Sequence, residues 1–214
     1  KSVTYQQALG SLWDKSVRVA ELARVIANRV GADAALATRA ASLCKCDLLT
    51  RMVNEFPELQ GIMGRYYAEH HGESAEVAAA LDSYYQPRFG GDDIASGRLG
   101  QVLSVAERLD TLAGIFAVGM KPSGNKDPFA LRRTALGLAR TLIEAGMELD
   151  LRGWRLRGLP WLAAQSAFTR CDVHVGCERR VIGADARRRF LDLDPRQLAE
   201  WHLRDAEKMR VVIP

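Results

Sequence analysis

Apolar residues recur at steps of three and four over most of the first 150 positions, which predicts a series of amphipathic helices. The clearest stripe begins at Trp13 and Val17, continues through Ala20 and ends at Val30. Gly31 follows as a stop signal, because glycine readily adopts the left-handed conformation that ends many helices. We therefore expect a long first helix that buries this stripe.

Four more helices are predicted between residues 34 and 119. Asp33 suits an N-cap, Pro57 suits a first helical turn, and Gly72 and Pro87 end the segments before them. The expected helical segments are residues 34–50, 57–71, 73–85 and 98–119. The last is apolar enough to be a central buried helix. No strand pattern or internal repeat is convincing, so the pattern indicates an all-α fold.

The run from Ser123 to Arg140 changes from turn-forming polar residues to a helix that carries two adjacent arginines. Asp127 is the expected N-cap and Pro128 the expected first helical residue. The predicted apolar stripe of this helix consists of Phe129, Leu136, Leu142 and Ile143.

The composition changes near residue 151. Residues 151–214 hold twelve arginines, one lysine and three of the four tryptophans, and glycine and proline interrupt any helical spacing. A short helix capped by Asp194, with Pro195 at its start, is the exception. Residues 1–150 carry 17 basic and 18 acidic side chains, whereas residues 151–214 carry 13 and 8. We expect a helical domain over residues 1–150 and a basic C-terminal tail over residues 151–214. The tail is either a second module or a non-native extension from a frameshift or a fusion.

Bulk composition excludes several classes of protein. No run of about 18 apolar residues exists, so we expect no membrane span. Four cysteines in 214 residues do not form a disulfide framework, which favours reduced thiols and a cytoplasmic protein. Neither familiar glycine-rich phosphate loop nor a serine nucleophile elbow occurs, so no nucleotide-binding motif or complete hydrolytic site is recognisable.

Three local groups carry side chains that bind metals. They are Cys44, Cys46 and Asp47; Glu69, His70, His71 and Glu73; and Glu107 and Asp110. Together they offer thiolate, imidazole and carboxylate to one cation. The competing interpretation is stronger, because a helical cysteine is usually a small buried group and a histidine at a helix end is usually solvated. Cys171, His174 and Cys177 lack a standard zinc spacing.

Basic residues provide the better functional signal. The candidates for phosphate binding are Lys126, Arg132, Arg133, Arg65 and Arg88. The first three surround a predicted helix start, where free amides and the helix dipole favour an anion, and arginine forks suit phosphate. The alternative is that the adjacent arginines pair with local carboxylates such as Asp127 or Asp110.

Three longer stretches resemble one known family. They are "CKCDLLTRMVNEFPELQGIMGRYYAEHHGE", "YYQPRFGGDDI" and "AERLDTLAGIFAVGMKPSGNKDPFALRRTALGLAR". In this order they resemble the β subunit of the bacterial tetrameric glycyl-tRNA synthetase. The resemblance runs from about Tyr5 to about Asp150, and "GNKDPFALRR" after "LDTLAGIF" is its most specific part.

The resemblance implies an HD-domain-like helical bundle, related to metal-dependent phosphohydrolases. Lys15 then stands at the first histidine ligand of that pattern, and Cys46 and Asp47 stand at its His-Asp pair. His70 or His71 matches a later histidine, and Asp110 matches the last aspartate. A protonated ammonium repels a cation, so the resemblance implies an eroded site without metal.

The resemblance also implies a role in ATP-dependent attachment of glycine to tRNA(Gly). In that family the α subunit handles glycine and ATP, and the β subunit serves tRNA binding and assembly. We therefore expect no cofactor in this chain, ATP and Mg²⁺ at the partner α subunit, and no activity from the chain alone. The large N-terminal part and the anticodon-binding domain of a β subunit are not matched. The alternatives are an HD-type metal-dependent phosphohydrolase and a non-catalytic helical interaction module.

Overall fold

The computed structural model describes residues 3–120, 122–123 and 125–149. These described residues form seven α-helices, two short 3₁₀ turns and one small hairpin, which confirms the all-α fold class; the HD-domain likeness stays a prediction. The hairpin was not predicted. The α-helices are α1 Leu12–Val30, α2 Ala34–Leu43, α3 Arg51–Glu55, α4 Ile62–His70, α5 Ala75–Ser83, α6 Arg98–Ala117 and α7 Leu131–Glu144. The 3₁₀ turns are η1 Asp47–Leu49 and η2 Pro57–Leu59, and the antiparallel strands are β1 Thr4–Gln6 and β2 Gly10–Ser11.

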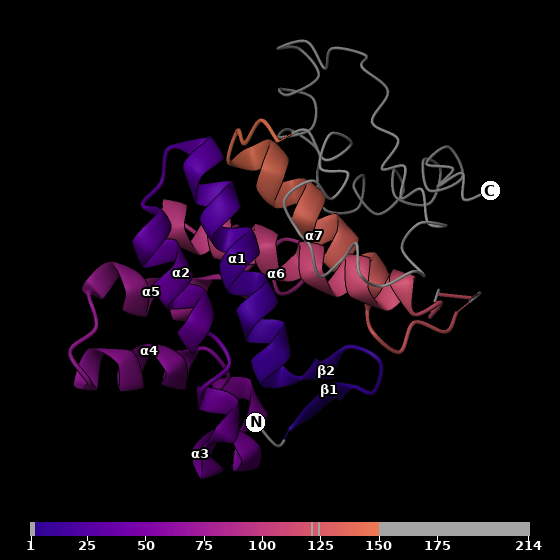
Figure 1. The fold of residues 1–214 in the computed structure, drawn as a ribbon, viewed down its shortest axis with the longest axis horizontal. Coiled ribbons are helices and arrows are strands. Elements are labelled where there is room, and N and C mark those ends of the chain that lie inside the picture. Colours follow the sequence, from indigo (N-terminus) through magenta and orange to yellow (C-terminus); the bar gives the residue numbers. More distant parts are fainter. Residues whose placement is uncertain (1–2, 121, 124, 150–214) are drawn as a thin grey trace. The chain divides into compact units, whose positions relative to one another are not determined.

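Helix α6 lies at the centre of the bundle and contacts α1, α2, α5 and α7, as predicted for this apolar segment (Figure 1). Val102, Leu103 and Ala106 on this helix have no exposed surface. Buried aliphatic side chains from neighbouring helices surround them, so hydrophobic burial holds the bundle around α6.

Helix α1 is capped at both ends, but its buried face differs from the predicted stripe. Gly31 ends the helix with a φ of 70°, as expected. Trp13 and Val17 are 52% and 53% exposed, so their assignment to the buried stripe was wrong. Lys15 is buried in their place. Helical periodicity places lysine on the solvent-facing side of α1, because the pattern contains no information about the distant carboxylates that compensate its charge.

Residues 34–71 contain more breaks than the sequence predicted. Asp33 caps α2 by accepting hydrogen bonds from the amides of residues 35 and 36, as expected. Pro57 begins a 3₁₀ turn rather than an α-helix, and α4 begins only after Gly61. Gly61 has a φ of 85°, and a Cβ there would lie 2.7 Å from the Tyr85 ring. The positive φ and the close approach to Tyr85 at Gly61 interrupt the helix predicted over residues 57–71.

Helix α7 begins three residues later than Pro128, which was the predicted first residue. Ala130 is the N-cap, with a φ of 52°, and the Asp127 carboxylate caps the helix from further upstream. Leu131 packs with Leu9 and Ile115 in one core cluster. Ile143 is 46% exposed, so its place in the predicted stripe was wrong.

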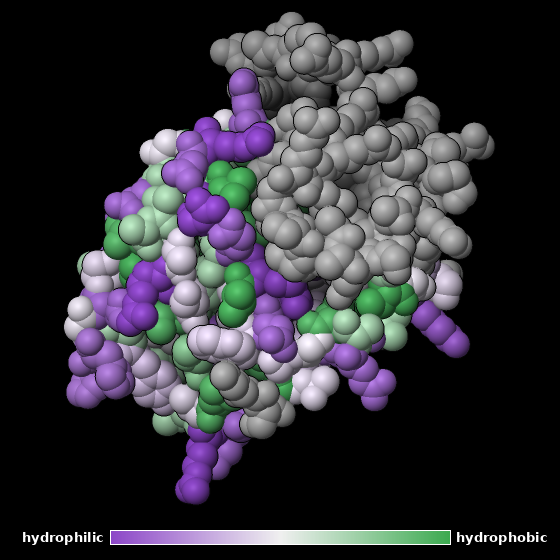
Figure 2. All heavy atoms as spheres, in the orientation of Figure 1, coloured by the Kyte–Doolittle hydropathy of each residue, from purple (hydrophilic) through white to green (hydrophobic). Residues whose placement is uncertain are grey.

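On the face seen in Figure 2, hydrophobic residues (green) and hydrophilic residues (purple) are interspersed. Within residues 3–149, no helix combines the length and apolar character that crossing a membrane requires. The predicted basic tail, its helix at Asp194 and the residues Cys171, His174 and Cys177 lie outside the described residues.

Candidate functional site

Two of the five predicted phosphate-binding residues, Arg88 and Arg133, line one hollow of about 380 Å³. Arg88 follows α5, and Arg133 lies in the first turn of α7. The remaining lining residues come from η2, the turn after α5, α6 and α7: Pro57, Glu58, Gln60, Tyr84, Tyr85, Pro87, Glu107, Arg108 and Thr134. The sequence analysis named both arginines, but it did not predict that they line the same hollow.

Arg108 forms part of the hollow's lining and was missed by sequence reasoning. Its guanidinium donates hydrogen bonds to the carbonyl oxygens of Tyr84, Tyr85, Gln86 and Pro87, at 3.1 to 3.2 Å, and to Ser104 Oγ. Only 8% of the residue is exposed, and burial lowers its pKa. No ion pair within 4.0 Å links Arg108 to a carboxylate of the described residues. A fixed positive charge therefore lies beside the hollow and holds the backbone that leads to Arg88.

Arg88 lines the hollow and is partly exposed. Its guanidinium pairs with Asp82 at 3.1 Å and lies 5.8 Å from the centre of the Tyr85 ring. The side chain is 37% exposed. Exposed ion pairs contribute little to stability, and the guanidinium fork carries more donors than this one contact uses. A phosphate can therefore bind Arg88 at small cost.

Lys126, Arg132 and Arg133 lie around the start of α7, as the sequence predicted, but only one of them lines the hollow. Arg133 lines the hollow, whereas Arg132 and Lys126 do not. The Asp127 carboxylate accepts hydrogen bonds from the amides of Leu131, at 2.8 Å, and Arg132, at 3.0 Å. A carboxylate already occupies the start of α7, so those two amides are not free for an external anion, contrary to our expectation.

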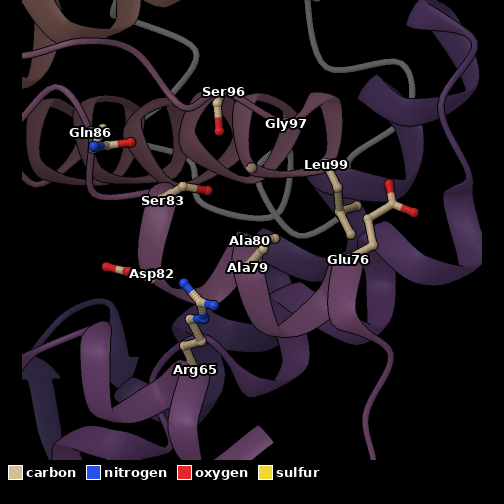
Figure 3. Close-up of a pocket in the computed structure, with 11 residues that line it drawn as sticks. Arg65, Glu76, Ala79, Ala80, Asp82, Ser83, Gln86, Ser96, Gly97 and Leu99 are labelled. Atoms are coloured by element: carbon tan, nitrogen blue, oxygen red, sulfur yellow. The ribbon is translucent and has the colours of Figure 1, made fainter. Parts of the chain in front are cut away.

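Arg65 lies at a different, smaller hollow of about 270 Å³ (Figure 3). It pairs with Glu69 at 2.8 Å, and its side chain extends towards Asp82 in the close-up. Glu76 and Asp82 also line this hollow. Two carboxylates repel phosphate, so this is the weaker of the two hollows as an anion site.

A buried ion network replaces the metal-binding pattern implied by the resemblance. Lys15 Nζ lies 3.0 Å from Asp110 Oδ2 and 3.4 Å from Glu107 Oε1. Arg18 binds the other Asp110 oxygen at 2.7 Å. Lys15 is 2% exposed, and the Asp110 side chain is fully buried. Asp110 thus pairs with cations inside the protein and does not pair with the α7 arginines, which was one alternative.

Lys45 adds a second ammonium to this network, 3.3 Å from Glu107. Burial lowers the pKa of Lys15, but the Glu107 and Asp110 carboxylates raise it by more, so the net shift is upward. Burial raises the pKa of Glu107, but Lys15 and Lys45 outweigh it and hold that pKa well below its usual range. Both partners are therefore ionised over the middle of the pH scale.

The other metal candidates do not gather around Asp110. Asp47 is buried, and its Oδ2 accepts a hydrogen bond from Gly61 at 2.7 Å. Its Oδ1 is buried with no hydrogen-bond partner among the described residues. His70 is exposed at the end of α4, and Cys46 is exposed before η1. Within the described part of the chain, no three His, Cys, Asp or Glu side chains are placed to hold one metal ion.

Cys44 behaves as a buried apolar residue. Burial raises the pKa of its thiol to about 11, and its Sγ donates to the Ala41 carbonyl at 3.1 Å. A neutral thiol is a poor metal ligand, because metals bind the thiolate. This geometry agrees with the interpretation of a helical cysteine as part of the core.

Comparison with known proteins gives a consistent result. A family model described as "Glycyl-tRNA synthetase beta subunit" matches residues 1–170, past the composition break near residue 151. The glycine--tRNA ligase beta subunit of Xanthomonas campestris pv. campestris is 67% identical over 150 residues, which cover 70% of this chain and 22% of that protein. The Xylella fastidiosa subunit is 58% identical over 163 residues, covering 76% and 23%. The Chromohalobacter salexigens subunit is 56% identical over 152 residues, covering 71% and 22%. The chain thus spans less than a quarter of the length of these relatives.

Proposed function

This chain belongs to the glycyl-tRNA synthetase β subunit family, and from that premise we propose that it docks tRNA phosphates in the ATP-dependent attachment of glycine to tRNA(Gly). Glycine, ATP and Mg²⁺ are handled by a partner α subunit in this proposal. In the same proposal this chain binds no cofactor. It contributes to tRNA binding and to assembly with the α subunit.

One observation carries the proposal: Arg88 and Arg133 line the same hollow, and the buried guanidinium of Arg108 lines it too. Arginine forks bind phosphate oxygens in pairs, and a rigid backbone around them lowers the entropy lost on binding. Arg108 provides that rigidity, because it joins four consecutive carbonyl groups immediately before Arg88.

The phosphohydrolase alternative lacks support from the geometry. A metal-dependent hydrolase needs neutral or anionic ligands around its cation, and it needs an open position for water. Here two lysine ammonium groups contact Glu107, and Lys15 also contacts Asp110. We propose that this internal network is structural. We therefore expect the purified protein to hold no stoichiometric transition metal.

Salt dependence of tRNA binding tests the docking proposal and separates it from a plain helical interaction module. We predict that replacing both Arg88 and Arg133 by alanine, in the enzyme assembled with its α subunit, weakens tRNA(Gly) binding. The slope of log K against log salt should fall by about one to two, because each lost phosphate contact retains its counterions. Fluorescence anisotropy at several salt concentrations measures the slope.

Arg24→Ala provides the matched control. Arg24 is an exposed arginine that pairs with Glu21 on α1 and does not line the hollow. The control should leave the slope unchanged. Equal slopes for the wild type and the double variant, with the fold intact by circular dichroism, would show that the hollow does not contact tRNA.

A further inference from the structure

Phe89 is exposed on the turn that directly follows Arg88, a lining residue of the hollow. It is 66% exposed, which is the highest value among the large hydrophobic side chains of the described residues. The Arg88 amide donates to Asp92 Oδ2 at 2.6 Å, and the Asp92 amide donates to the Phe89 carbonyl at 3.2 Å. These two bonds hold the turn that carries Phe89 directly after Arg88, which lines the hollow.

A second exposed aromatic residue adjoins the hollow from another part of the chain. Phe56 is 47% exposed and directly precedes Pro57, a lining residue. Isolated apolar residues on a surface need no explanation, but aromatic rings beside arginines are the combination that binds unpaired nucleotides. The bases stack on the rings, and the phosphates bind the guanidinium groups.

The charges around the hollow favour an anion. Its lining includes Arg88, Arg108 and Arg133 against the carboxylates Glu58 and Glu107. Glu107 is compensated by two internal lysines, at 3.4 and 3.3 Å. Arg88 is paired with Asp82 at 3.1 Å, so among the described residues the unpaired charges of the lining are those of Arg108 and Arg133 against the single carboxylate of Glu58.

We propose that this hollow binds one unpaired nucleotide of an RNA strand, with its phosphate on Arg88 and Arg133 and its base stacked on Phe89. This inference rests on the proposed docking function. It narrows the ligand of the hollow from any RNA phosphate to an unpaired nucleotide. The volume of about 380 Å³ suits a single small ligand and is too small for a duplex. RNA duplexes hide their base faces, whereas unpaired nucleotides offer theirs for stacking.

The test compares unpaired and paired RNA on the enzyme assembled with its α subunit. The probes are a single-stranded oligoribonucleotide of about ten residues and a blunt RNA duplex of the same length. Phe89→Ala should weaken binding of the single strand about tenfold and change duplex binding less than about twofold, because only the single strand stacks. Phe89→Trp should restore the single-strand affinity. Tyr66→Ala, which removes another exposed aromatic residue that does not line the hollow, should have no effect.

The outcomes separate this inference from the docking proposal. If the double variant Arg88→Ala, Arg133→Ala binds RNA as well as the wild type does, the docking proposal itself fails. If the arginine variant weakens binding but Phe89→Ala does not, or weakens both probes equally, docking stands and the nucleotide inference is overturned. If Phe89→Ala instead reduces association with the α subunit at unchanged single-strand affinity, the ring binds protein, and the inference is likewise overturned.

Discussion

Lys15 shows how a single residue can contradict its local pattern. It lies between positions of an apparent apolar stripe, yet it is buried while Trp13 and Val17 are exposed. The reason is the pair of carboxylates on α6, far along the sequence, which compensate the ammonium. The family resemblance placed Lys15 at the position of a metal ligand, but it did not show that the ammonium would reach Asp110.

We predict that Lys15→Met destabilises the fold by about 2–4 kcal/mol. Methionine matches the stem of lysine but removes the charge, which leaves the buried Asp110 and the half-buried Glu107 with less compensation. The estimate is at the lower end for a broken buried pair, since Arg18 and Lys45 remain. Urea denaturation followed by circular dichroism measures the loss, with Arg24→Met as the exposed control.

The pH dependence of stability identifies the cause of that loss. The pKa of Lys15 is raised in the fold, so its contribution is complete below its ordinary value of 10.5 and disappears as pH rises through the folded value. The pKa of Glu107 is lowered, so its contribution is complete above 4.5 and disappears as pH falls towards the folded value. In Lys15→Met the alkaline loss should be smaller than in the wild type but not absent, because this second lysine of the network, Lys45, still contributes. Burial lowers the pKa of Lys45, but Glu107 and the other groups around it together raise that pKa by more. The same alkaline loss in variant and wild type would show that the network does not stabilise the fold.

At the scale of elements, sequence patterns located the helices better than their ends. The caps at Asp33 and Gly31 were predicted because each acts on residues next to it in the chain. The start of α7 was not, because Ala130 adopts a left-handed φ that alanine rarely accepts. Packing of Leu131 against Leu9 and Ile115 supplies the compensation, and a local rule does not see it.

We predict that Asp127→Ala destabilises the fold by about 1 kcal/mol. The change removes both hydrogen bonds that the carboxylate accepts from the first amides of α7. Asp127→Asn keeps one acceptor oxygen and should lose less. Thermal denaturation measures the difference between the two variants. An alanine variant as stable as the wild type would mean that water replaces the cap without cost.

At the scale of the whole molecule, charge is divided unevenly along the chain. Residues 1–150 are nearly neutral, so any anion binding there depends on the local hollow rather than on a general basic field. Sequence analysis could name Arg88 and Arg133 from their chemistry. It could not bring them together, because the hollow is formed by α6, α7 and the turns around η2 and α5.

The packing of the described helices leads to a last prediction, that a chain ending at Leu149 folds by itself. Helix α6 contacts α1, α2, α5 and α7, and the core residues of these helices pack against one another. The truncated chain should keep its helical circular dichroism per residue over α1 to α7 and unfold in one cooperative transition, as expected for one hydrophobic core. Limited proteolysis of the full chain should cut first between Arg152 and Arg157, where the composition changes, and leave a fragment of the same size. Aggregation of the truncated chain, or resistance of that segment to cleavage, would instead mean that residues 150–214 complete the same core.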